Sequence, residues 1–262
     1  MSAALSWAEA SLSGAGLSAP LLILVVAIIF LSAFMRGLTG FGFAIAAVPL
    51  MSIVIDPKLA VGIAVVLPVP SGLLDLPTAW PASHRPAMRS LIGGALVGTP
   101  LGMLALRVMP VDLQRIAIAL AAILALLAVW LLKKPSHLGL LARPVPAGLA
   151  SGVLNGLAGM PGPPVVAYLL TIPITAAAAR ASLIVFFLAT GLFATVTGLA
   201  TGVVNARSAL VSAICLIPFF VGNKLGGRLF HASEAQVYRR GALLILAIGA
   251  ASAAWKGVAG LL

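Results

Sequence analysis

The sequence has very few charged residues, and acidic ones are the rarest. Only 8% of its 262 residues are charged. The acids number five, namely Glu9, Asp56, Asp75, Asp112 and Glu234. Soluble domains carry about a quarter charged residues, so this chain lacks the polar surface that a soluble fold requires. The deficit excludes a soluble globular protein.

Side chains for metal binding and nucleophilic catalysis are also scarce. The single cysteine, Cys215, lies inside an apolar run, and the three histidines are far apart. A lone cysteine forms neither an intramolecular disulfide nor a cysteine-based metal site. Metalloprotease, P-loop and serine-hydrolase motifs are all missing. We therefore expect no enzyme, no catalytic residues, no metal and no cofactor.

Apolar residues dominate what is present. They make up 62% of the chain, and the mean hydropathy is +1.20. Long runs such as 116–132 lack the alternation of a barrel strand and approach the length needed to cross the hydrocarbon layer of about 30 Å. The composition predicts an all-α, polytopic transmembrane bundle that has the lipid bilayer as its main partner.

The net charge of +11 does not indicate nucleic-acid binding. The basic residues lie in short gaps between apolar segments and form no periodic face, as the positive-inside rule describes. Residues 1–19 contain no lysine or arginine, which excludes a signal peptide and predicts an N-terminal interfacial segment.

Ten apolar segments follow along the chain, in two sets of five. A basic linker at 133–144 separates a first transmembrane repeat, 20–132, from a second, 145–262. The second segment of each set is too short for a complete span. The ten segments are 20–36, 41–55, 58–80, 88–106, 113–132, 145–158, 162–174, 178–201, 207–226 and 238–258.

The two halves share sequence matches at a nearly constant spacing. Arg36-Gly-Leu-Thr-Gly-Phe-Gly42 corresponds to Asn155-Gly-Leu-Ala-Gly-Met-Pro-Gly162, 119 residues later. Ser71-Gly72-Leu73 matches Thr190-Gly191-Leu192 at the same spacing. Arg89-Ser90 and Pro100 match Arg207-Ser208 and Pro218 at a spacing of 118. These matches predict two homologous repeats.

The number of crossings decides the symmetry of the repeats. Five crossings per half would make them inverted, and four would make them parallel, so the sequence allows eight to ten membrane segments. With ten crossings, eleven basic residues fall on one side and five on the other; with eight, the sides are nearly level. The charge bias therefore favours inverted repeats with both termini outside.

The duplicated glycine motif predicts a binding site. Gly40, Gly42, Gly159 and Gly162 permit non-helical backbone, which a membrane tolerates only inside protein or beside a wet cavity. Helices that begin near Phe43 and Pro163 would direct free N–H groups into the breaks, where an anion could bind. The alternative is close helix packing, which we assign to the stripes Gly94-Gly98-Gly102 and Gly222-Gly226.

Arg36 and Asn155 occupy equivalent places, one residue before each motif's first glycine. Arginine forms bidentate pairs with oxyanions, and asparagine donates through its amide. The alternatives are an interfacial arginine and a helix–helix hydrogen bond. Thr39 and Thr190 are weaker candidates, because such hydroxyls often bond their own backbone. Asp75, in a kinked apolar segment, is the candidate for proton coupling, for pairing with Arg36, or for an interfacial position.

These glycine motifs resemble those of the sulfite exporter TauE/SafE family, also called the toluene-sulfonate uptake permease family. The family pattern is a glycine-rich break followed by an apolar helix with Pro-x-Leu, as in the first copy here, which continues to Pro49-Leu-Met. The resemblance covers essentially the whole chain. Phe41 and Phe43 in the first copy, and Met160-Pro161 in the second, depart from the pattern.

The resemblance implies transport of sulfite, a sulfonate or a related organic anion across a bacterial cytoplasmic (inner) membrane. The departures suggest a larger or more apolar substrate. We expect a multi-pass secondary transporter that works by alternating access, with proton coupling as an option. The alternatives are a passive anion channel and a membrane accessory protein that transports nothing. The sequence is compatible with a homo-oligomer and leaves the direction of transport open.

Overall fold

The computed structural model describes residues 16–39, 42–131 and 139–232, and all regular structure within these ranges is helical. The predicted all-α class is thereby confirmed. Of the expected segments, 238–258 lies outside the described residues, as do 1–15 of the N-terminal segment and 133–138 of the linker.

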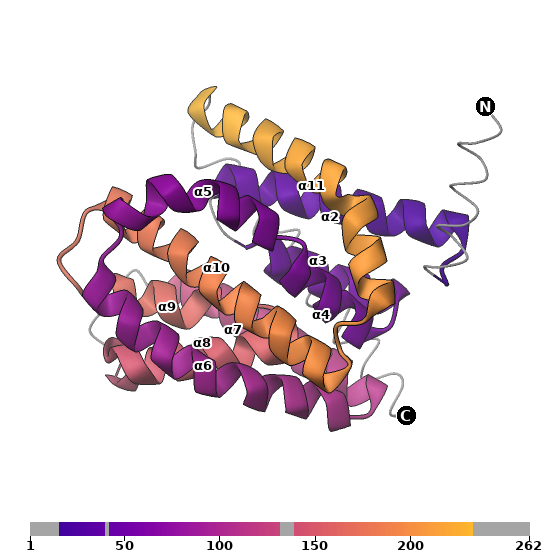
Figure 1. Cartoon of the computed structure of the whole chain (residues 1–262), viewed down its shortest axis with the longest axis horizontal. Helices are drawn as coiled ribbons and strands as arrows, with labels where there is room; N and C mark the ends of the chain where they lie inside the picture. Colours follow the sequence, from indigo (N-terminus) through magenta and orange to yellow (C-terminus); the bar gives the residue numbers. More distant parts are fainter. Residues whose placement is uncertain (1–15, 40–41, 132–138, 233–262) are drawn as a thin grey trace.

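The helices follow the apolar segments closely (Figure 1). Most predicted boundaries fall within three residues of the helix ends, because the segments end where glycine, proline and charged residues interrupt them. In chain order the helices are α2 (Ala19–Thr39), α3 (Phe43–Val54), α4 (Pro57–Val66), α5 (Val69–Ala82), α6 (Arg85–Val108), α7 (Val111–Leu131), η2 (Gly139–Ala142), α8 (Pro144–Ala158), α9 (Gly162–Leu169), α10 (Ala176–Thr201) and α11 (Ala206–Ala232).

Five stretches within the described ranges are long and apolar enough to cross a membrane. One of them, Pro57–Ala82, joins α4 and α5 across a kink at Leu67-Pro68. The five stretches are Ala19–Leu38, Pro57–Ala82, Arg85–Val108, Ala176–Thr201 and Ala206–Arg228. The protein is therefore a multi-pass membrane protein.

Two helices are much shorter than a membrane is thick. α3 has 12 residues and α9 has 8, which at about 1.5 Å per residue gives lengths of about 18 Å and 12 Å. Each packs back against the helix that precedes it, α3 on α2 and α9 on α8. Most of the residues of both helices are buried, whereas leucines on α5, α6 and α10 face outward. The short helices thus lie inside the bundle.

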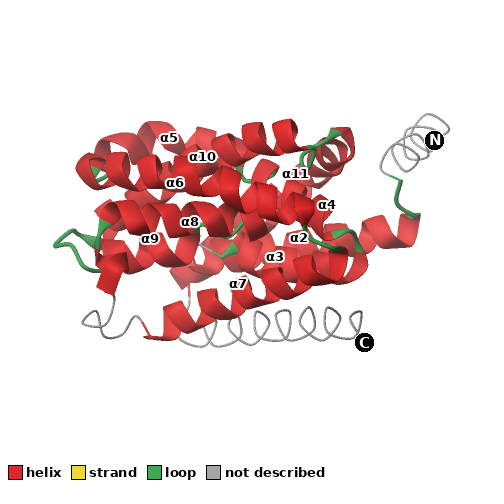
Figure 2. Ribbon diagram, turned by 90° about the horizontal axis from the view of Figure 1, so that it is seen from below, coloured by secondary structure: helices red, strands yellow, loops and turns green. Residues whose placement is uncertain are grey.

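Two pairs of long helices approach each other very closely. α6 lies along α8, and α11 lies along α2 (Figures 1 and 2). A Cβ atom at Gly98 would lie 2.8 Å from the amide nitrogen of Val153, and one at Gly226 would overlap the carbonyl oxygen of Phe34 and lie 3.0 Å from the amide nitrogen of Leu38. The two glycine stripes predicted as packing faces therefore do lie at helix–helix contacts, because only glycine allows two backbones to approach so closely.

Candidate functional site

The first break separates α2 from α3. α2 ends at Thr39, and α3 begins at Phe43, as the sequence predicts. Gly42 turns the chain in a left-handed conformation with φ of 93°, which glycine adopts without strain. The first intrahelical bond of α3 is donated by the Ala46 N–H to the Gly42 carbonyl. The N–H groups of Phe43, Ala44 and Ile45 therefore have no partner within the helix.

The second break separates α8 from α9. Gly159 ends α8 with φ of 67°, and its N–H donates to the Asn155 carbonyl at 2.7 Å. α9 begins at Gly162, close to the predicted start. One detail of the prediction is wrong here, because Pro163 and Pro164 follow Gly162 and have no N–H to offer an anion. Hydrogen-bond donors are therefore concentrated at the start of α3.

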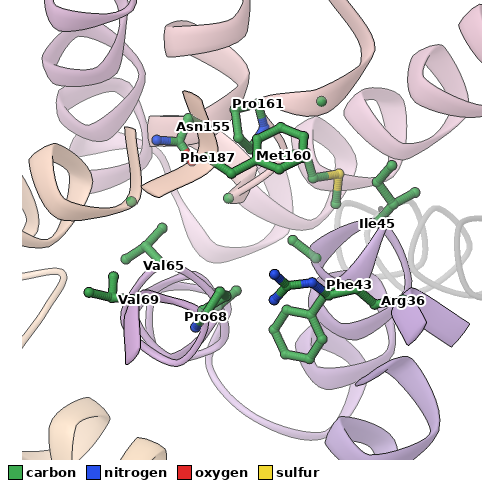
Figure 3. A pocket seen from close by; sticks show the side chains of 16 residues that line it. Arg36, Phe43, Ile45, Val65, Pro68, Val69, Asn155, Met160, Pro161 and Phe187 are labelled. Carbon is green, nitrogen blue, oxygen red and sulfur yellow. The ribbon is translucent and has the colours of Figure 1, made fainter. Parts of the chain in front are cut away.

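The two breaks meet at one cavity of about 90 Å³ (Figure 3). Arg36, Gly42, Asn155, Gly159 and Gly162 all line it, so the fold brings five of the predicted site residues together. Since about 10–15 Å³ on this measure suffices for one water molecule, the cavity has room for a small anion of several heavy atoms.

Arg36 lies in the last turn of α2 and extends into the cavity (Figure 3). Its Cζ atom lies 5.4 Å from the ring centroid of Phe219 in α11, within the range of a cation–π interaction. Phe219 packs edge-on against Phe43, with ring centroids 5.0 Å apart. The Phe219 ring orients the guanidinium, and Arg36 has no carboxylate ion pair among the described residues.

Asn155 lies at the opposite wall and is 2% exposed. Its Nδ2 donates to the carbonyl oxygen of Thr190 at 3.0 Å, so the helix–helix hydrogen bond considered as an alternative does form. The second Nδ2 hydrogen and the carbonyl side of the amide are not used by this bond. The Thr190 hydroxyl donates to the Phe186 carbonyl in its own helix at 2.8 Å, which turns it away from any ligand.

The remaining candidates lie elsewhere. Thr39 is the last residue of α2, and Gly40 lies outside the described residues. Asp75 is exposed on α5 and lines a separate hollow with residues of α11. It forms no ion pair with Arg36 but acts on it electrostatically at longer range. The pairing of these two residues considered from the sequence is thus not a direct contact.

Sequence reasoning missed the wall that α4, α5 and α10 contribute. Val65, Pro68 and Val69 line the cavity at the kink between α4 and α5, with Phe187 and Gly191 opposite in α10. Pro68 and Phe187 are 119 residues apart, which is the spacing of the duplicated glycine motif. That spacing is the signal in the sequence that relates these two cavity-lining positions.

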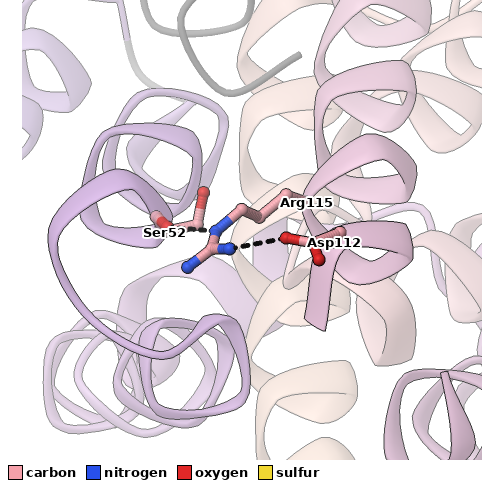
Figure 4. Close-up of polar contacts among 3 residues, drawn as sticks. All are labelled: Ser52, Asp112 and Arg115. Carbon is pink, nitrogen blue, oxygen red and sulfur yellow. Dashed lines mark hydrogen bonds and ion pairs between the residues drawn. The ribbon is translucent and has the colours of Figure 1, made fainter. Parts of the chain in front are cut away.

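The far end of α3 is held by an arginine (Figure 4). The Nε atom of Arg115, on α7, donates to the Ser52 carbonyl in the last turn of α3 at 3.1 Å. Its Nη1 atom donates to the Asp112 carboxylate at 2.9 Å. A positive charge is favourable at the C-terminal end of a helix, so this contact fixes α3 and with it the N-terminal end that faces the cavity.

The cavity has two chemically different walls. Arg36 and the N-terminal end of α3 are positive, since the helix dipole adds to the guanidinium charge. Met160, Pro161 and Phe187 on the other side are apolar. The arrangement suits a small anion that carries an apolar group, and the described residues that line the cavity include no acid or thiol.

Comparison with known proteins agrees with this geometry. The family model of the sulfite exporter TauE/SafE matches residues 24–253, a range that includes both breaks and all the cavity-lining residues. No match emerges among curated proteins or solved structures. Because the family match covers most of the chain, this multi-pass membrane protein belongs to the sulfite exporter TauE/SafE family, whose members are membrane transporters of sulfur-containing anions.

Proposed function

We propose that this protein is a secondary transporter that moves sulfite or a small sulfonate across the bacterial cytoplasmic membrane by alternating access. The anion binds in the cavity between the two glycine breaks. The observation that carries the proposal is the position of Arg36, a cation inside the bundle that extends into this cavity without an ion-pair partner among the described residues. Arginine is suited to a sulfonate or sulfite group, because its fork of donors binds two oxygens at once.

The backbone supports anion binding at the same wall. The N–H groups of Phe43, Ala44 and Ile45 have no intrahelical acceptor, and all three residues line the cavity. A helix N-terminus with free N–H groups stabilises an anion without a second buried cation.

The opposite wall favours an anion with a small apolar group. Met160 and Pro161 stand where the family pattern leads us to expect glycines in the second break, and Phe187 lines the cavity with them. An alkyl sulfonate would direct its oxygens to Arg36 and its carbon atoms to this wall. Sulfite has no carbon atoms to bury there, so we expect the sulfonate to bind more tightly.

Asp75 is the candidate for proton coupling. It is the only acid within the membrane-spanning stretch Pro57–Ala82, and it acts electrostatically on Arg36. Protonation would remove a negative charge that attracts the guanidinium, and would thereby leave the arginine more available to the anion. Binding of a proton and binding of the anion would then favour each other.

Flux measurements in proteoliposomes test the proposal. Uptake of labelled sulfite and of a short alkyl sulfonate is measured with and without a pH gradient for wild type, Arg36→Gln, Asp75→Asn and Arg107→Gln. Arg107, an exposed residue in the last turn of α6, is the matched control. We expect Arg36→Gln to abolish flux, Asp75→Asn to remove its dependence on the gradient, and Arg107→Gln to change neither.

The alternatives predict different results. A passive channel would give flux that is indifferent to the gradient in wild type and that survives Asp75→Asn. An accessory protein would transport neither anion. Equal loss of flux in Arg36→Gln and Arg107→Gln would contradict a binding role for Arg36, because it would indicate a general effect of surface charge.

A further inference from the structure

Besides the central cavity, a second hollow opens between α5 and α11. Its volume is about 380 Å³, and its polar lining consists of Ser71, Asp75, Asn223 and Lys224. Lys224 lies within the predicted segment 207–226, and α11 continues through it to Ala232. Asp75 and Lys224 both lie within membrane-spanning stretches. A hollow of this size has room for many water molecules, which would lower the cost of charged groups within a membrane-spanning stretch.

A seam between α6 and α10 has similar residues but no room. Thr99 of α6 and Thr190 of α10 line it, together with Leu96 and Phe193, and no water molecule fits. Thr99 is fully buried, and its hydroxyl has no hydrogen-bond partner among the described residues. A buried hydroxyl without a partner is unfavourable, and it would gain water if the seam opened.

The packing of the long helices shows which residues of α6 correspond to which residues of α11, and so allows the seam to be compared with the hollow. A Cβ at Gly98 would contact the amide nitrogen of Val153, and one at Gly222 would contact that of Phe34. The contacted residues Phe34 and Val153 are 119 apart, while Gly98 and Gly222 are 124 apart. The fourth helices of the two halves therefore correspond at 124, not at the 118 that the match of Pro100 to Pro218 predicts.

With this register the hollow and the seam are equivalent. On α5 and α10, Ser71 corresponds to Thr190 and Leu74 to Phe193, at 119. On α11 and α6, Phe220 corresponds to Leu96 and Asn223 to Thr99, at 124. The same four positions thus surround an open space in one half of the molecule and a closed seam in the other.

We infer that the hollow between α5 and α11 and the seam between α6 and α10 are the two access paths of the transporter, one open and one closed in this structure. The inference rests on the proposed function. It assigns the described state to one side of the transport cycle, and it requires the α6–α10 seam to open when the α5–α11 hollow closes.

Each path is separated from the central cavity by a thin partition. On the open side, Phe219 lies under Arg36 while its neighbour Phe220 lines the hollow, with the two ring centroids 5.9 Å apart. On the closed side, Asn155 of the cavity donates to the carbonyl of Thr190 in the seam. Arg36 and Asn155, which are equivalent in sequence, therefore lie at equivalent partitions.

The charges distinguish the two paths. Asp75 and Lys224 correspond to Ala194 and Pro100, so only the open path carries ionisable side chains at these positions. The two groups carry opposite charges, so the hollow is polar without a net charge, whereas the equivalent positions of the seam are apolar.

Thiol labelling in proteoliposomes tests the inference. Asn223→Cys places a thiol in the hollow and Thr99→Cys places one at the equivalent position in the seam, both in a Cys215→Ala background. Ser71→Cys and Thr190→Cys form a second matched pair in case one variant fails to fold. A membrane-impermeant thiol reagent is supplied on either side, with and without sulfite or the sulfonate, and retained flux shows that each variant is folded.

We expect the Asn223→Cys thiol to react from one side and the Thr99→Cys thiol from the opposite side. The Thr99→Cys reaction should be slower by about 10- to 1000-fold, if the second state has a population of about 0.1–10%. Conditions that raise one rate should lower the other. Labelling of both thiols from the same side, or labelling rates that rise and fall together, would overturn the inference. Anion flux measured in the same proteoliposomes would still support the proposed function. Opposite labelling without flux of either anion would instead support the paths and contradict the substrate.

Discussion

Adjacent glycines on α6 provide a sharp test of the close contact between α6 and α8. A Cβ at Gly94 would overlap the carbonyl oxygen of Val145 and lie 2.7 Å from the amide nitrogen of Leu149. A Cβ at Gly93, one residue earlier, meets nothing within 4 Å. Gly94→Ala and Gly93→Ala therefore make the same chemical change in the same helix and differ only in what the methyl group meets.

The magnitude follows from two terms. Alanine is favoured over glycine in a helix interior by about 0.8–1 kcal/mol, and this gain is common to both variants. Overpacking costs about 1–3 kcal/mol and applies to Gly94→Ala alone, because the atoms that it meets belong to a backbone that cannot turn aside. We expect Gly93→Ala to be slightly more stable than wild type, and Gly94→Ala to be less stable than Gly93→Ala by about 1–3 kcal/mol.

Thermal unfolding of the purified protein in detergent measures the difference. At about 2–4 °C per kcal/mol for chains of roughly this size, Gly94→Ala should melt several degrees below Gly93→Ala. Gly98→Ala, whose Cβ would lie 2.8 Å from the amide nitrogen of Val153, should repeat the loss. A Gly94→Ala protein that melts at or above Gly93→Ala would refute the close contact between α6 and α8.

Three further predictions concern the site. Gly42→Ala should lower the melting temperature, because a left-handed conformation costs a non-glycine residue about 1–2 kcal/mol. Gly162→Ala should keep the melting temperature, since its Cβ would meet only Phe187 at 3.7 Å, and should reduce flux because the methyl group fills part of the cavity. Arg115→Gln should destabilise the protein by about 1–3 kcal/mol, because the charged hydrogen bond to the Ser52 carbonyl is lost. Asp112→Asn should cost less than about 1 kcal/mol in the same melting assay, since the Arg115–Asp112 ion pair is partly exposed. Phe219→Leu should weaken sulfonate binding, measured by calorimetry, because the ring orients Arg36; unchanged affinity would contradict that role.

Much of the helical framework was predictable because it depends on local properties. A run of apolar residues long enough to cross a bilayer must be helical, since lipid offers no partner for free backbone groups. Glycine and proline end such runs, which is why the start of α3 at Phe43 and the start of α9 at Gly162 agree with expectation. Gly98 and Gly222, which pack on Val153 and Phe34, are 124 residues apart, whereas Pro100 and Pro218 are 118 apart. A short sequence match does not report which backbones touch.

The candidate site was predictable in part. The duplicated motif pointed to Arg36 and Asn155, and the fold brings both to one cavity. Thr190 belongs to the hydrogen bond that supports Asn155 and contributes through its carbonyl, as its hydroxyl bonds its own helix. The α4–α5 kink and Phe219 were missed, since nothing in a local pattern says that residues so distant in sequence share a wall.

The sequence by itself determined that this chain is a helical membrane protein, where its helices break, and which family it resembles, because hydropathy, helix length and backbone freedom are local quantities. Only the tertiary structure decided that the two breaks face one cavity, that Arg36 lies on the ring of Phe219 and extends into that cavity, and that space is left between α5 and α11 but not between α6 and α10. These features depend on how closely glycine lets distant helices approach. That approach is a property of pairs of helices in space, and no single segment contains it.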